Sequence, residues 1–85
     1  MKGYILIQRP GDREIMIDYS DYFRKYSDAE LIEDCEKQRK LGIVGVHQQA
    51  LSLVGLRFVM KERNLDCPII IEDNILVKFR DDEVA

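Results

Sequence analysis

The stretch Gly42–Arg63, GIVGVHQQALSLVGLRFVMKER, contains the longest apolar periodic run of the chain and its single histidine. When the residues are placed at about 100° per residue around a helix, the apolar ones form a broad arc, and Leu51 and Phe58 extend it. The members of the arc are Val46, Ala50, Leu53, Val54, Leu56 and Met60. We therefore predict one long helix over 46–63. Because an arc this wide must be buried against more than one neighbour, we expect the rest of the chain to pack around this helix.

The opposite side of the predicted helix carries a strip of small or uncharged side chains, which runs from Gln48 to Val59. Small side chains at this spacing allow another backbone to approach closely. The helix also has more apolar surface than a thin sheet and one narrow-striped helix can cover. We therefore predict a small interaction module that self-associates as a twofold dimer. An unidentified protein is a second possible partner. The predicted interaction residues are His47, Gln48, Gln49, Ser52, Gly55 and Val59.

Length and composition indicate one small domain. The chain has 85 residues, of which 46% are hydrophobic and 34% are charged, so it is too apolar for disorder and too polar for a membrane protein. No apolar run approaches the roughly 18 residues of a membrane-spanning helix, and no signal peptide is visible. We expect a soluble, cytoplasmic protein with one α+β domain over 1–80 and an acidic flexible tail over 81–85.

The N-terminal part of the chain suggests a β-hairpin over residues 3–19. Gly3–Gln8 and Arg13–Tyr19 are both rich in β-branched and aromatic residues, and the second segment alternates apolar with acidic positions. Pro10 and Gly11 between them suit the two central positions of a type II turn. The following segment, Ser20–Tyr26, could form a short helix whose aromatic rings, together with Tyr19, close one end of the core.

The remainder of the chain predicts a second helix and a second hairpin. Ser27 and Glu30 match a capping box, so a helix is expected over 28–40, ended by Gly42. Two β-branched runs separated by a tight polar connection predict a hairpin over 69–80. The predicted fold is therefore α+β: two hairpins (3–19 and 69–80) form a mostly antiparallel sheet, with two main helices (28–40 and 46–63) packed on one face.

Charge and cysteine usage argue against several kinds of function. The net charge of −3 disfavours broad binding to nucleic acid or to anionic membranes, which both require clustered positive charge. Cys35 and Cys67 form no C-x-x-C pair, so we expect two buried free thiols, although a single disulfide is an alternative. We find no ligand spacing for a metal, and we predict no cofactor.

A catalytic role would depend on His47 alone, because it is the only histidine. It lies in the first turn of the predicted long helix, where the helix dipole disfavours its charged form, so it could act as a neutral general base. A hydrogen-bonded structural histidine is the favoured interpretation. The preceding glycines, Gly42 and Gly45, resemble an anion-binding loop but lack the P-loop's Gly-Lys-Ser/Thr, so they are expected to shape the turn between helices. We predict no enzyme.

The alternative function is DNA binding. Two helices joined by a short glycine turn, with Gln48 and Gln49 in the first turn of the second helix, resemble a helix-turn-helix in outline, and Lys78 and Arg80 of the last hairpin could serve as a wing. The acidic first helix and the apolar content of the second argue against this alternative.

Overall fold

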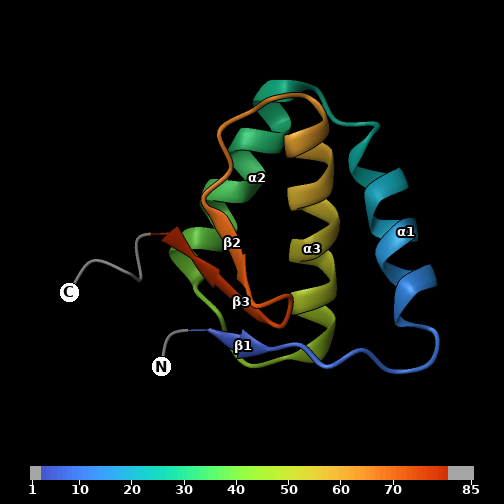
Figure 1. Ribbon diagram of the computed structural model, residues 1–85. Coiled ribbons are helices and arrows are strands. Elements are labelled where there is room, and N and C mark those ends of the chain that lie inside the picture. Colours follow the sequence, from blue (N-terminus) through green and yellow to red (C-terminus); the bar gives the residue numbers. More distant parts are fainter. Residues whose placement is uncertain (1–2, 81–85) are drawn as a thin grey trace.

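The computed structural model describes residues 3–80, which form three helices and a small antiparallel sheet of three strands (Figure 1). The fold is α+β overall, but the predicted arrangement of two hairpins with two main helices is wrong. The predicted acidic tail over 81–85 lies outside the described residues. In chain order the elements are β1 (Tyr4–Ile5), α1 (Asp12–Phe23), α2 (Asp28–Leu41), α3 (His47–Glu62), β2 (Ile69–Glu72) and β3 (Leu76–Phe79).

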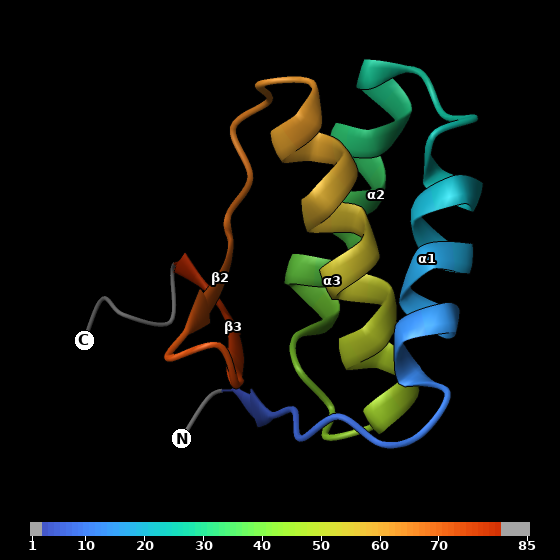
Figure 2. The same cartoon turned by 45° about the vertical axis from the view of Figure 1, so that its right-hand side comes forward.

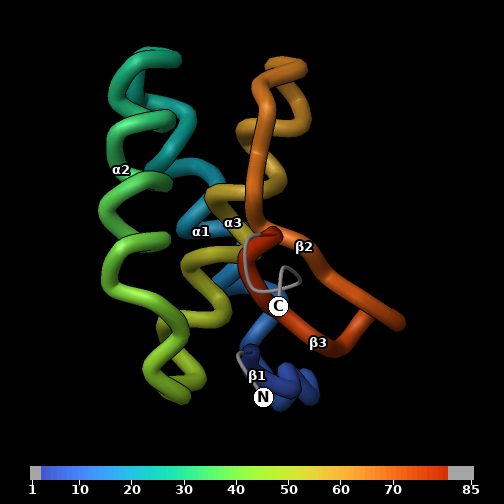
Figure 3. The backbone as a smooth tube through the Cα atoms, turned by 90° about the vertical axis from the view of Figure 1, so that its left-hand side faces the viewer, coloured from blue at the N-terminus to red at the C-terminus, as the bar shows by residue number. Residues whose placement is uncertain are grey.

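Helix α3 lies at the centre of the fold, between α1 on one side and the β2–β3 hairpin on the other, as Figures 1 and 2 show. Figure 3 shows all three helices on one side of β2 and β3. The long helix predicted over 46–63 is present and is buried on several sides. Two members of its predicted apolar arc, Val46 and Phe58, are instead about half exposed, at 51% and 53%. The buried residues of α3 are Ala50, Leu51, Leu53, Gly55, Leu56, Val59 and Met60.

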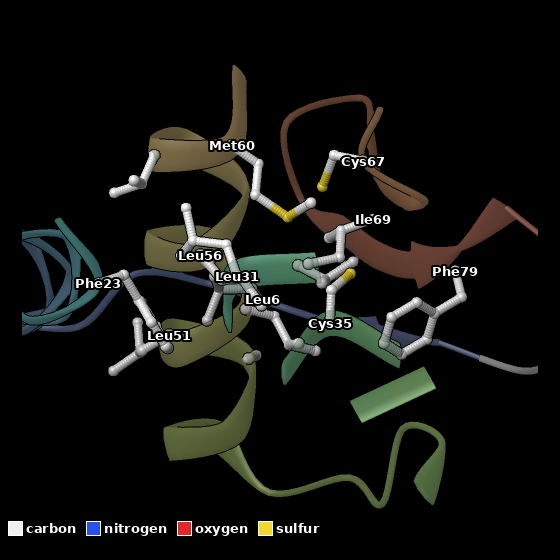
Figure 4. Close-up of a cluster of buried hydrophobic side chains, with 14 residues drawn as sticks. Leu6, Phe23, Leu31, Cys35, Leu51, Leu56, Met60, Cys67, Ile69 and Phe79 are labelled. Atoms are coloured by element: carbon white, nitrogen blue, oxygen red, sulfur yellow. The ribbon is translucent and has the colours of Figure 1, made fainter. Parts of the chain in front are cut away.

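The hydrophobic core collects side chains from every layer of the structure (Figure 4). Burying each large apolar side chain contributes roughly 1.5–3 kcal/mol, so this cluster supplies most of the stability of so short a chain. Outside α3, its members are Leu6, Phe23, Leu31, Cys35, Cys67, Ile69, Val77 and Phe79.

The hairpin predicted over 3–19 is wrong, although the turn at its centre is present. The Asp12 backbone N–H donates to the Arg9 carbonyl oxygen at 3.0 Å, and Gly11 has a φ of 90°, as a type II turn requires. The chain after this turn is helical, because Asp12, Met16 and Phe23 recur at helical spacing and turn one face of α1 towards α3. The alternation within Arg13–Tyr19 was therefore part of a longer helical pattern.

Of the short helix that we predicted over Ser20–Tyr26, only Ser20–Phe23 is helical, and it is the last turn of α1 rather than a separate element. Ser20 lies inside α1, where its hydroxyl donates to the Met16 carbonyl oxygen at 3.0 Å. Strand β1 pairs with β3 instead of a neighbouring strand, with Tyr4 opposite Val77. Because β2 also pairs with β3, the sheet order is β1-β3-β2.

The second half of the chain follows the sequence prediction closely. At the start of α2, Ser27 and Glu30 exchange both hydrogen bonds of a capping box, at 2.8 and 3.1 Å. Gly42 follows its last turn with a φ of 81°. The hairpin predicted over 69–80 is present as β2 and β3, joined by a turn in which Asp73 and Asn74 have positive φ. Among residues 3–80, no helix is long and apolar enough to cross a membrane.

At Gly55, α1 lies very close to α3. A Cβ atom built at this position would lie 2.7 Å from the Cβ of Tyr19 and 3.1 Å from the backbone nitrogen of Ser20. Because two of the three nearest atoms belong to the α1 backbone, a side chain here would force the whole helix outwards. The two helices can pack at this distance only with glycine at position 55.

We predict that Gly55→Ala destabilises the protein despite its better helix propensity. Alanine would gain about 1 kcal/mol in propensity, but overpacking a tight contact costs roughly 1–3 kcal/mol, and here backbone must move. The free energy of unfolding should be measured by urea denaturation followed by circular dichroism, with Ser52→Ala on the same helix as the control. A Gly55→Ala protein more stable than the wild type would contradict the close contact.

Candidate functional site

The strip predicted from the sequence to mediate self-association lies partly against α1 of the same chain. Gly55 is buried against α1, Val59 has no exposed surface, and the Gln48 side-chain amide donates to the Tyr19 hydroxyl at 2.9 Å. Ser52 donates to the Gln49 carbonyl oxygen at 2.8 Å. The predicted close approach of a backbone does occur, but that backbone belongs to α1. Self-association through this strip stays a prediction.

Gln49 holds the turn between α2 and α3. Its side-chain nitrogen donates to the Gly42 carbonyl oxygen at 2.8 Å, and its side-chain oxygen accepts from the Val44 backbone N–H at 3.0 Å. The DNA-binding alternative needs the first turn of α3 to face outwards. Gln49 is committed to the turn, and Gln48 is the exposed member of the pair. That alternative stays a prediction, which a gel-shift assay at low salt would test.

His47 takes part in a partly buried hydrogen-bonded cluster with Tyr4 and Asp12. Its Nε2 lies 2.7 Å from the Asp12 Oδ2, and its Nδ1 lies 3.0 Å from the Tyr4 hydroxyl. The side chains of His47 and Asp12 are only 15% and 5% exposed. With Asp12 ionised and the ring neutral, Nε2–H donates to the carboxylate and Nδ1 accepts from the Tyr4 hydroxyl. One tautomer of His47 thus satisfies all three groups.

The carboxylate of Asp12 is held in its charged form. The Arg9 backbone N–H donates to Oδ2 at 2.8 Å, and this bond lowers the pKa of Asp12 against the opposing effect of burial. The hydrogen bond with His47 lowers this pKa further. The cluster joins β1, the start of α1 and the start of α3. Both ring nitrogens of His47 are thus engaged by side chains of the same chain.

We predict that Tyr4→Phe destabilises the protein by about 1 kcal/mol, because it leaves the His47 Nδ1 without its hydrogen-bond donor. Chemical denaturation measures the change in the free energy of unfolding. Tyr22→Phe is the matched control, since Tyr22 is 53% exposed and its hydroxyl bonds only Tyr26 among residues 3–80. Equal stability of Tyr4→Phe and Tyr22→Phe would contradict the proposed role of the cluster.

The lowered pKa of Asp12 also predicts a pH dependence. A carboxyl whose pKa is lower in the folded state stabilises the fold above its unfolded value of 3.8, and this contribution is lost as the pH falls through the folded value. Asp12→Asn should therefore have a lower melting temperature than the wild type at pH 7, and this difference in melting temperature should become smaller below about pH 4. Thermal melts across this pH range measure the difference, with the exposed Asp18→Asn as control. A difference in melting temperature that stays constant with pH would contradict the charged form of Asp12.

An apolar groove between α1 and α3 is an exposed feature that sequence reasoning missed. It has a volume of about 260 Å³, and Ile17 and Phe58 on its two sides are 48% and 53% exposed. Arg24 closes one end, with its guanidinium carbon 5.5 Å from the centre of the Phe58 ring and its nitrogens paired to Asp21 and Glu62. We call this the α1–α3 groove. Its lining residues are Arg13, Met16, Ile17, Ser20, Arg24, Val54 and Phe58.

The helical spacing of residues 13–21 could have indicated this groove, but we had assigned Arg13–Tyr19 to a strand. Treating Arg13–Tyr19 as a strand placed Ile15 and Ile17 on one sheet face, whereas the helix separates them. Ile15 lies on the other side of α1, where it lines a second groove of about 410 Å³ with Tyr19 and Tyr22. A helical assignment of the same residues would have placed Arg13, Ile17 and Asp21 in one line.

The two cysteines are buried free thiols, as predicted, and they lie together in the core (Figure 4). A hydrogen bond from the Cys35 thiol lowers the pKa of Cys67, and the same contact, with burial, raises the pKa of Cys35. Within residues 3–80 no group of three or more histidine, cysteine or acidic side chains is placed to hold a metal ion.

Comparisons of the chain with models of protein families, with curated proteins and with solved structures found no match.

Proposed function

We propose that this protein is a small protein-interaction domain that self-associates through the face formed by α1 and α3. The single observation that carries the proposal is the α1–α3 groove, where Ile17 and Phe58 stand half exposed on the two sides of an apolar floor. When a partner covers apolar side chains that line a groove, their removal from water lowers the free energy and favours binding. This face replaces the small-residue strip of α3 as the candidate surface.

The composition of the groove is typical of the centre of a protein–protein interface. Its floor is apolar, through Met16 and Val54, and it is bordered by Arg13 and Arg24. Aromatic side chains and arginines are the residues that most often dominate binding energy at such sites. Arg24 is already held in place by Asp21, Glu62 and the ring of Phe58, so little side-chain entropy is lost when a partner docks against it.

A twofold dimer suits a face of this kind, because a small patch used by both subunits is doubled in area. Each subunit would offer Ile17 and Phe58 to the other, and both side chains would leave water together. Helix α1 packs on α3 and presents its outer side to solvent, so a second copy can reach this face without any rearrangement of the core.

Light scattering coupled to size-exclusion chromatography tests the proposal. We expect the wild type to have twice the mass of the chain at micromolar concentrations, and we expect Ile17→Asp to have the mass of a monomer. Ile32→Asp is the matched control, because Ile32 lies on α2 and is 47% exposed, almost the same as Ile17. A monomeric wild type would overturn self-association, and a dimeric Ile17→Asp would move it to another face.

A further inference from the structure

Three residues of α1 form a line of opposite charges about an apolar centre. Arg13, Ile17 and Asp21 are spaced four residues apart, so they lie on one ridge of the helix, and all three are exposed. The ridge begins with a positive charge and ends with a negative charge. We call these three residues the α1 stripe.

The α1 stripe is complementary to itself in one orientation only. If two copies cross antiparallel about a twofold axis at Ile17, the residue four positions before Ile17 in one copy meets the residue four positions after it in the other. Arg13 then faces the partner's Asp21, and Asp21 faces the partner's Arg13. A parallel pairing would place like charges together, at a cost in affinity.

The charges of the stripe are available for such a pairing. Arg13 makes no ion pair with any of residues 3–80. Asp21 is 61% exposed and bonds Arg24 through Oδ1, at 2.6 Å. Its second oxygen, Oδ2, accepts no hydrogen bond from this part of the chain, so it can accept one from the partner's Arg13 while the bond to Arg24 persists.

The apolar centre of the stripe adjoins the α1–α3 groove. Ile17 lines the groove beside Val54 and Phe58, so an antiparallel partner brings its own Ile17 over the same apolar floor. Ridges of residues spaced four apart are also the ridges that interlock in the commonest class of helix packing. The apolar contact and the paired charges are therefore satisfied in a single arrangement.

We propose that the partner of the α1–α3 groove is a second copy of this chain, bound with its α1 antiparallel and with Arg13 paired to the partner's Asp21 on both sides of the twofold axis. This inference rests on the proposed function. The apolar side chains supply most of the affinity, and the charges select the antiparallel orientation and the register, because exposed ion pairs add little net affinity while opposed like charges weaken binding.

Charge reversal tests the pairing. Arg13→Asp places two aspartates opposite each other at both ends of the stripe, and Asp21→Arg does the same with two arginines. We expect each single variant to raise the dimer dissociation constant by about tenfold or more, measured by analytical ultracentrifugation. Lys37→Asp on α2 is the control for the change in net charge, since its side chain is 71% exposed and far from the stripe in sequence. It should leave the dissociation constant unchanged.

Mixing the variants makes the test specific for the register. In an equimolar mixture, the aspartate introduced in one variant would face the arginine introduced in the other, and the unmodified Asp21 would face the unmodified Arg13. We therefore expect the two weakened variants to form a heterodimer, and the double variant Arg13→Asp/Asp21→Arg to recover the wild-type constant. Because rescue by mixing cannot arise from a variant that fails to fold, this readout separates lost pairing from lost structure.

The outcomes distinguish this inference from the proposed function. A wild type that stays monomeric overturns both. A dimeric wild type whose two single variants dimerise as tightly as it does overturns the antiparallel pairing and leaves self-association in place. Weakened single variants that neither form a heterodimer nor recover in the double variant overturn the register of Arg13 with Asp21.

Discussion

The close contact of α1 with α3 at Gly55 is the constraint on which the rest of the structure depends. The backbone of Ser20 comes so near that a single methyl group could not be placed between the helices. Since α1 packs against α3 at this distance, its N-terminus brings Asp12 to His47, and its outer side leaves Ile17 facing solvent beside Phe58. The partly buried polar cluster and the exposed groove therefore share one cause.

The Tyr4–His47–Asp12 cluster complements this apolar contact at the start of α3. Apolar packing is tolerant of small sliding movements, whereas a buried carboxylate must keep its hydrogen bonds or incur the cost of desolvation. The cluster draws its three side chains from β1, α1 and α3, so it sets the relative positions of elements that are far apart in the chain. In a domain this small, one such cluster can decide between alternative packings of the same helices.

In the dimer that we propose, apolar and charged groups on the surface of α1 have different roles. Ile17 and Phe58 would supply apolar area whose burial favours binding in any orientation. Arg13 and Asp21 would set the orientation, because opposite charges at the two ends of a helix ridge match only an antiparallel copy. An acidic chain can therefore associate with itself despite its net charge of −3, provided that the contacting patch is neutral and self-complementary.

The sequence by itself determined the features whose causes are local. The capping box at Ser27 and the turn at Gly11 depend on a few neighbouring residues, and both are present as predicted. Only the tertiary structure decided that Arg13–Tyr19 is a helix, because its alternation fits a strand until Phe23 and a facing helix are included. Gly55 also combines a local and a long-range determinant. Its small size predicted that a backbone would approach the helix at this position. The sequence could not identify that backbone as α1, because a glycine leaves room for any close neighbour, and long-range packing decides which one is present.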